Sequence, residues 1–574
     1  MTAVINPAAP TSTQVDPQRP PSRRSWWQPV TLFVLLSTAY FVAGSVLIMR
    51  YNLYDGDGIS RVANAGYTLF SRDPHLSAIG FVWNPLPSLV QVPLLPLSHW
   101  WPELRTYGLT GVLQSALFMA AAALMVRQIA IDRSTGPVWR WVAVTCFALN
   151  PLIVIYGGAG MSEAAEVFCV LWCVRYLLLW VDSQRVGDLA WAGIALGVGY
   201  LARYEMVVAA AGAALLVLAV VLVRLPRTER IPSAALNVII LLFPIALAFI
   251  TWAVTGWIVN GELFATLSSR YGNGSQVAEA VARSGTAHSA SADLLLIAVR
   301  LFAMQPFVGI AAVLAAALAV LTKKFDALVP AAVCGSVLAF SAWSQFTGTT
   351  FGWFRFYLLA IPMVTVIALV CWTPSGLPVG WWRLGSLPSR LGAALLTASL
   401  LIGIPVTAQS MLNQDIGNQQ LQFGLNSLLN PGTYPPDEQW YRRMGDDDRL
   451  LASYLDRKHL PEGSVLMDTF FCWGVWLASD NPKQFVITSD YDFVVALNRP
   501  WDFGIQYIVV SNPNISDADA VNLRYPTLWA DGAGFASVVY SSNEPGGKER
   551  RRVYRVNGQP GSPAAATAST PPKK

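Results

Sequence analysis

Long apolar segments recur along most of the chain and are separated by short polar connections. A helix needs roughly 20 apolar residues to cross a bilayer, and about eleven segments approach that length. This pattern predicts a polytopic α-helical membrane protein. The segments lie at about 30–49, 107–126, 139–156, 164–182, 188–202, 206–223, 233–257, 293–321, 327–346, 356–372 and 391–408.

Basic residues in the connections indicate the orientation, because cytoplasmic loops of membrane proteins are enriched in Lys and Arg. With the N-terminus inside, the cytoplasmic connections hold Arg127, Arg133, Arg140, Arg185, Arg224, Arg227, Arg230, Lys323, Lys324, Arg383 and Arg390. The short outer connections hold only Arg203, Arg270, Arg283 and Arg355. This bias predicts an external C-terminus.

After about residue 409 the pattern changes to short apolar runs between polar segments. Strands are expected at 464–468, 484–487, 507–510 and 552–556, with an amphipathic helix at 448–455. Alternation of strands and helices predicts a small α/β domain. We therefore expect a disordered cytoplasmic tail at 1–28, a transmembrane domain at 29–408 with an external loop at 50–106, an extracytoplasmic α/β domain at 409–557 and a disordered tail at 558–574.

Two external loops differ in character. The first ends in an apolar stretch broken by prolines, 86–101, which is typical of helices lying in the membrane interface. The second, at about 258–292, is rich in Gly and Ser and is expected to be a mobile loop.

Composition supports the membrane assignment. Hydrophobic residues make up 54% of the chain and charged residues only 13%, against roughly 25% charged residues in soluble domains. The net charge of +5 is small and spread out, so nucleic-acid binding is not expected. The six cysteines have neither disulfide nor metal-ligand spacing.

Two carboxylates, Asp55 and Asp57, directly follow the first apolar segment. Ionisable groups at a bilayer border are costly and usually mark a site. A carboxylate placed there can act as the general base for an acceptor hydroxyl. The Asp-x-Asp spacing also suits Mg²⁺ or Mn²⁺. In a third interpretation, Asp57 or Ser60 caps a helix that begins near Ile59. Arg61, one turn further on, favours a functional interpretation.

Further charged residues fall at the predicted outer helix ends. Glu163 can reach the same cavity as the first loop, or can simply favour the N-terminal dipole of a helix capped by Ser162. Arg203 and Glu205 form either an ion pair that anchors a bend or a phosphate or sugar contact.

Arg355 stands among aromatic residues, in Trp353-Phe354-Arg355-Phe356-Tyr357. A guanidinium in this setting can grip a phosphate with two hydrogen bonds while the rings, including Tyr357, pack on a lipid or sugar. The alternative is an interfacial anchor. Arg270 in the second loop and Arg300 are weaker candidates for the same role.

These features together resemble the GT-C superfamily of integral membrane glycosyltransferases, especially bacterial members similar to protein O-mannosyltransferases and aminoarabinose transferases. The resemblance covers about 30–408. It rests on Tyr54-Asp55-Gly56-Asp57-Gly58-Ile59-Ser60-Arg61, Trp83-Asn84-Pro85-Leu86, Gly160-Met161-Ser162-Glu163, Arg203-Tyr204-Glu205 and Arg355-Phe356-Tyr357.

The resemblance implies an inverting glycosyltransferase in the cytoplasmic membrane of a bacterium, which uses a polyprenyl-phosphate sugar at the outer face. The family's loop aspartate matches Asp57 best, with Asp55 as the near alternative, and this carboxylate would deprotonate the acceptor hydroxyl. Arg355 would hold the departing phosphate. The acceptor would be an envelope glycan, lipid or protein. Relatives often carry Asp-Glu in this loop, whereas here Gly56 separates two aspartates, so both the choice of base and the participation of a metal stay open.

Two other classes of protein fit parts of the pattern. A transporter or flippase of a lipid-linked envelope precursor would use the charged residues to line a substrate path, but such proteins tend to show repeated halves, and none is detected. A scaffold protein for envelope assembly would use the acidic loop only to cap a helix.

Overall fold

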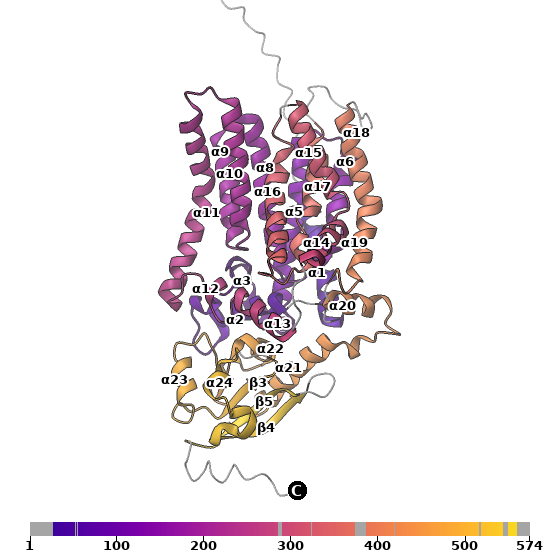
Figure 1. Cartoon of the computed structure of the whole chain (residues 1–574). Helices are drawn as coiled ribbons and strands as arrows, with labels where there is room; N and C mark the ends of the chain where they lie inside the picture. The colour runs from indigo at the N-terminus through magenta and orange to yellow at the C-terminus, as the bar shows by residue number, and fades with distance from the viewer. Residues whose placement is uncertain are drawn as a thin grey trace, which may run out of the picture.

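The computed structural model describes residues 27–51, 53, 56–284, 290–322, 324–372, 386–417, 419–515, 518–543 and 549–559. Long helices form a bundle, and a small α/β domain lies at one end of it (Figure 1). Asp55 and most of the two tails predicted to be disordered lie outside the described residues.

Seven described helices are long and apolar enough to cross a membrane. They are α1 (Trp27–Tyr51), α5 (Leu109–Asp132), α8 (Glu163–Ser183), α10 (Met206–Arg224), α11 (Arg230–Asn260), α16 (Leu328–Phe346) and the continuous segment Leu387–Met411, which contains α18 (Leu387–Ala398), the π-turn η4 (Ser399–Gly403) and α19 (Ile404–Met411).

Two further candidates are bent helix pairs, which raise the described spans to as many as nine. The pair α6 (Pro137–Ala148) and α7 (Pro151–Gly157) bends by 63°, and the pair α14 (Ala290–Met304) and α15 (Val308–Thr322) by 80°. Pro151 opens α7 and Pro306 lies in the break between α14 and α15, and a proline cannot continue the preceding hydrogen-bond ladder. The remaining predicted segments form the shorter α9 (Val186–Tyr200) and η3 (Phe354–Tyr357) with α17 (Ala360–Val370). All the predicted segments are thus helical, while a count of eleven spans stays a prediction.

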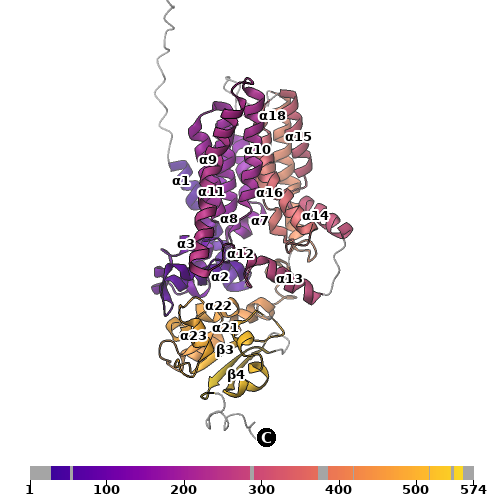
Figure 2. The same cartoon turned by 60° about the vertical axis from the view of Figure 1, so that its left-hand side comes forward.

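The first external loop lies between the bundle and the α/β domain (Figure 1, Figure 2). Its helices are α2 (Gly56–Phe70), η1 (Leu76–Ile79), α3 (Leu86–Gln91), η2 (Leu95–His99) and α4 (Glu103–Thr106). The short helices expected at 86–101 are present. The helix expected to begin near Ile59 begins at Gly56 instead, so Asp57 lies in its first turn and is not its N-cap.

The second external loop, predicted to be a mobile loop, includes helical segments in its described part. It contains α12 (Ala265–Ser268) and α13 (Asn273–Ser284). The side chain of Val277 is buried, and the Gln276 amide donates a hydrogen bond of 2.8 Å to the Tyr271 carbonyl. The composition did not predict this helical segment, because a high content of Gly and Ser is more typical of loops.

The C-terminal part contains one five-stranded sheet of order β2-β1-β3-β5-β4. Strands β2, β1 and β3 are parallel, and β5 and β4 are added antiparallel. Its elements are α20 (Gln419–Leu429), η5 (Pro436–Glu438), α21 (Trp440–Asp456), β1 (Val465–Met467), α22 (Thr469–Ala478), η6 (Pro482–Gln484), β2 (Phe485–Val486), α23 (Phe493–Asn498), β3 (Tyr507–Ser511), α24 (Ala520–Arg524), α25 (Leu528–Asp531), η7 (Gly532–Gly534), β4 (Ala536–Asn543) and β5 (Glu549–Val556). The four predicted strands are confirmed. Strand β4 was missed because it is an edge strand, half exposed and rich in serine.

A shared hydrophobic core joins the first external loop to the α/β domain. Val62 and Tyr67 of α2 are buried in one cluster with Leu451 and Trp476 of the domain. The rings of Tyr67 and Trp476 meet edge to face with centroids 4.7 Å apart. This packing fixes α2, and with it Asp57, between the bundle and the domain.

Candidate active site

Seven charged side chains meet where the helix bundle faces α2, and we call them the ionic cluster. They come from α2, from the N-terminal turns of α8, from the α9–α10 connection and from η3. The cluster consists of Arg61, Arg203, Arg355, Asp57, Glu163, Glu166 and Glu205.

Arg203 is the most heavily paired member of the ionic cluster. Its guanidinium nitrogens lie 2.8 Å from Glu163 Oε1, 3.2 Å from Glu166 Oε2 and 2.5 Å from Glu205 Oε1. Burial alone would lower the pKa of Arg203, but these carboxylates together raise that pKa well above its ordinary value. Arg203 therefore keeps its charge, and that charge is already matched by carboxylates.

Arg355 links two carboxylates across the cluster. Its Nη2 lies 3.0 Å from Asp57 Oδ2, and its Nε lies 3.1 Å from Glu163 Oε1. The rings of Trp353 and Phe356 flank the guanidinium, each with its centroid 5.5 Å away. The Asp57 side chain is 31% exposed, whereas those of Arg355 and Glu163 are 6% and 2% exposed. Of these three side chains, that of Asp57 is thus the one that solvent or a ligand reaches most easily.

Arg61 is the arginine that α2 contributes to the ionic cluster. It donates a hydrogen bond of 3.2 Å to the Asp57 carbonyl, and its guanidinium lies 5.0 Å from the centre of the Trp83 ring. Burial lowers the pKa of Arg61, while Asp57 and Glu163 act in the opposite direction. Trp83 is held in place because Asn84 donates to the Tyr200 carbonyl at the end of α9.

Two glycines allow α2 and α8 to approach. A Cβ atom on Gly58 would lie 2.6 Å from the Ala159 carbonyl oxygen, closer than such atoms pack. Gly160 has φ of 72°, a left-handed conformation that glycine adopts without strain. The local sequence therefore brings the start of α2 against the start of α8, and Asp57 near Glu163.

Asp57 lies at the boundary of two cavities. The first, the ionic cavity, has a volume of about 190 Å³ and is lined by Arg61, Arg203, Arg355, Trp83 and Asp57 among others. The second, the polar cavity, has a volume of about 440 Å³ and lies between α2 and the α/β domain. A third, the apolar cavity of about 240 Å³, shares Asn84, Tyr204 and Thr266 with the ionic cavity and is lined mainly by α10, α11 and the second external loop.

The structure thus brings together Asp57, Arg61, Glu163, Arg203, Glu205 and Arg355, all of which the sequence singled out. Two other candidates lie elsewhere. The Tyr357 hydroxyl donates to Gln345 Oε1 at 2.8 Å, within the bundle. Arg270 is exposed on the second external loop, where its charge lies near Asp468.

Two residues have roles that sequence reasoning did not assign. Glu166 belongs to the ionic cluster, and its only signal was its spacing of three residues from Glu163, which puts both on one helix face. Arg300 is not at the cluster but donates to backbone carbonyls, including that of Gly352 at 2.5 Å and Ile416 at 3.2 Å. It therefore supports the loop that carries Arg355.

Metal binding at the acidic loop is not tested by this geometry. Within the part of the chain that the structure describes, no three His, Cys, Asp or Glu side chains are grouped to hold a metal ion. Because Asp55 lies outside the described residues, the Asp55–Asp57 pair as a ligand for Mg²⁺ or Mn²⁺ stays a prediction.

Comparisons with known proteins found similarity in fold alone. No protein-family model matches the chain, and no curated protein matches its sequence. Among solved structures, the chain is similar to the archaeal oligosaccharyltransferase AglB from Archaeoglobus fulgidus in complex with an inhibitory peptide and a dolichol-phosphate, at 11% identity and a TM-score of 0.40 over 92% of this chain and 74% of that one. A second Archaeoglobus fulgidus oligosaccharyltransferase structure, with Zn and sulfate, matches at 12% identity and a TM-score of 0.39 over 90% of this chain and 72% of that one. At these TM-scores the similarity carries no argument about chemistry, which must come from the site itself.

Proposed function

We propose that the protein is a membrane glycosyltransferase that moves a sugar from a polyprenyl-phosphate donor to an acceptor hydroxyl, with Asp57 as the general base. The observation that supports this most directly is that Asp57 lines both the ionic cavity and the polar cavity. A base at such a boundary can touch an acceptor on one side and a donor on the other.

The ionic and apolar cavities suit the two halves of the proposed donor. A phosphate needs a cationic partner with directed N–H groups, and Arg355, whose Nη2 contacts the partly exposed Asp57, lines the ionic cavity. A prenyl chain needs an apolar path, and the adjoining apolar cavity is lined by Phe249, Trp252 and Phe264 among others. A donor that enters from the bilayer would place its phosphate near the ionic cluster.

In the proposed reaction, Arg355 changes partner from Asp57 to the donor phosphate. Asp57 then accepts the proton of the acceptor hydroxyl while that oxygen forms a bond to the anomeric carbon. The bond from this carbon to the phosphate oxygen breaks on the opposite side, so the anomeric configuration inverts. The electron pair leaves with the polyprenyl phosphate, whose developing charge Arg355 stabilises.

The setting proposed for this reaction is the outer face of a bacterial cytoplasmic membrane, with the α/β domain outside the cell. The sign of the loop charges supports this orientation. Glu163 and Glu205 serve in this scheme to hold Arg203 and Arg355 in place.

The test is the change Asp57→Asn in the full chain, purified into lipid nanodiscs and supplied with labelled polyprenyl-phosphate sugars and cell-envelope extract as the acceptor. Loss of a general base is expected to slow transfer by roughly 100- to 10,000-fold. Asp502→Asn, an exposed position in the α/β domain, is the matched control. Transfer at the wild-type rate by Asp57→Asn would remove Asp57 as the base. A wild-type protein that moves lipid across vesicles without transferring sugar would instead be a transporter.

A further inference from the structure

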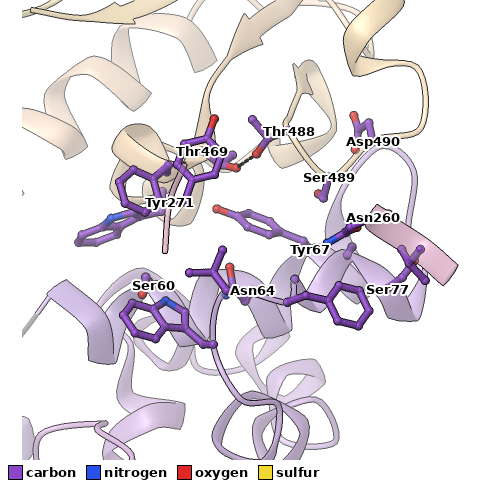
Figure 3. Close-up of a pocket in the computed structure, with 18 of the residues that line it drawn as sticks. Ser60, Asn64, Tyr67, Ser77, Asn260, Tyr271, Thr469, Thr488, Ser489 and Asp490 are labelled. Carbon is purple, nitrogen blue, oxygen red and sulfur yellow. Dashed lines mark hydrogen bonds between the residues drawn. The ribbon is translucent and has the colours of Figure 1, made fainter. Parts of the chain in front are cut away.

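The polar cavity is built jointly by three separate parts of the chain. Figure 3 shows Asn64 and Tyr67 of α2 on one side of it, facing Thr469, Thr488 and Ser489 of the α/β domain. Tyr271 of the second external loop completes the wall. Its volume of about 440 Å³ falls in the range of about 300–1,000 Å³ that is usual for ligand sites.

The lining of the polar cavity combines polar and apolar side chains and is almost uncharged. Among its described residues there is no Lys or Arg, and Asp57, Asp490 and His75 are the titratable groups other than tyrosines. Hydroxyl and carboxamide side chains make up about half of the remainder, and each hydroxyl can both donate and accept a hydrogen bond. These residues are Ser60, Asn64, Tyr67, Ser77, Asn260, Tyr271, Gln276, Thr469, Thr488, Ser489 and Tyr491.

Flat apolar surfaces alternate with these polar groups. Trp83, Phe470 and Trp473 line the cavity, and the Tyr271 ring lies against Phe470 with centroids 4.7 Å apart. The His75 ring stacks on Tyr491 with centroids 4.2 Å apart. A ligand with apolar faces and polar edges would therefore find both kinds of partner.

Two polar atoms at the far wall are buried without a hydrogen-bond partner in the described part of the chain. Ser489 Oγ and Asp490 Oδ1 have no hydrogen-bond partner among the described residues. The other oxygen of Asp490 accepts a hydrogen bond of 3.2 Å from the Ile487 amide and lies 3.4 Å from Arg72. Burial raises the pKa of Asp490 to about 7, so near neutral pH a share of the molecules carries a carboxyl that can also donate.

We propose that the polar cavity binds a neutral oligosaccharide, which is the glycan acceptor of the transfer reaction. A sugar ring presents hydroxyls at its edge and C–H groups on its faces, and this matches the alternation of hydroxyl and aromatic residues. The absence of Lys and Arg from the described lining disfavours a phosphorylated or otherwise anionic acceptor. As the acceptor, the oligosaccharide rests on the proposed function, because Asp57 must reach one of its hydroxyls.

The experiment measures binding apart from transfer, with the full-length Asp57→Asn protein in nanodiscs. The probes are short linear neutral oligosaccharides of glucose, mannose, galactose and arabinose, compared with an oligogalacturonate and a Ser/Thr-rich peptide. At least one neutral oligosaccharide is expected to bind, and to bind more tightly than the oligogalacturonate and the peptide. Preference for the anionic sugar or the peptide, or binding of no neutral oligosaccharide, would overturn the inference.

Substitutions of lining residues test whether the oligosaccharide binds in the polar cavity. Tyr271→Ala should weaken oligosaccharide binding by about tenfold or more, because a packing face is lost. Tyr271→Phe keeps the ring and removes only the hydroxyl that donates to Asp468 at 2.9 Å, so it should retain most of the binding. Ser489→Ala should also weaken binding, and Ser537→Ala on β4 is its matched control. Unchanged binding in both Tyr271→Ala and Ser489→Ala would place the oligosaccharide elsewhere.

The two proposals fail in different ways. If a neutral oligosaccharide binds but Asp57→Asn still transfers sugar, the general-base mechanism is wrong and the cavity assignment stands. If transfer requires Asp57 but only the peptide binds, the cavity assignment is wrong and the mechanism stands.

Discussion

Substitution of Arg355 is expected to reduce the rate of sugar transfer much more than the free energy of unfolding. The change Arg355→Gln removes a guanidinium that is 6% exposed and contacts Asp57 at 3.0 Å and Glu163 at 3.1 Å. Breaking a buried ion pair usually costs roughly 3–5 kcal/mol, because an unpaired charge stays buried.

Here the loss of stability should be smaller for two reasons. Glu163 keeps its contact with Arg203 at 2.8 Å, and the Asp57 side chain is already 31% exposed and can be hydrated. We expect the free energy of unfolding to fall by on the order of 1–2 kcal/mol. Under the proposed function, loss of the group that stabilises the departing phosphate should instead slow transfer by roughly 100- to 1,000-fold, or about 3–4 kcal/mol.

The assay compares the initial rate of sugar transfer with thermal unfolding of the same nanodisc preparations. Arg355→Lys should fall between the wild type and Arg355→Gln, because an ammonium keeps the charge but loses the planar pair of donors. Arg185→Gln removes a surface ion pair of 3.2 Å at a position where Arg185 is 71% exposed, and serves as the control. Transfer by Arg355→Gln at the wild-type rate per folded molecule would show that Arg355 has a structural role only.

Three other changes follow from the geometry. Glu166→Gln should keep the fold, because Arg203 retains Glu163 and Glu205, and should leave the midpoint of thermal unfolding nearly unchanged. Gly58→Ala should displace Asp57 and slow transfer by roughly 100-fold, whereas Gly187→Ala, which meets no atom within 4 Å, should not. Because burial raises the pKa of Asp490 to about 7 from 3.8, the folded chain binds that proton more tightly than the unfolded chain. The free energy of unfolding should therefore fall as the pH rises between about 4 and 7, and Asp490→Asn should flatten that slope in a series of thermal melts.

Much of the candidate site could be predicted because its members lie at helix ends. Apolar length locates such ends in the sequence, and the sign of the loop charges places Glu163, Arg203 and Arg355 on the same side as the first external loop. Parallel strands such as β1 and β3 were likewise visible as short apolar runs with polar borders.

Other features depend on where a side chain points in the folded protein, which the sequence alone does not determine. Tyr357 is two residues from Arg355, yet in the 3₁₀ turn η3 its hydroxyl points to Gln345 and away from the ionic cluster. Arg270 lies in the second external loop, whose helices were not predicted because the segment is rich in Gly and Ser. The polar cavity could not be predicted either, since its walls come from segments about 200 residues apart that meet only through the tertiary fold.

The charge balance of the ionic cluster constrains how the proposed donor would enter. Arg203 and Arg355 are both already paired with carboxylates, so a phosphate that enters the cluster must compete with a carboxylate for its arginine. One carboxylate must give up its arginine. Glu163 is 2% exposed and would leave a buried charge, whereas Asp57 is 31% exposed and borders a polar cavity. Asp57 is therefore the carboxylate that a donor phosphate would displace. Under the proposed function, this exchange releases the base from its ion pair only when the donor is bound, which couples proton removal from the acceptor to the presence of the sugar.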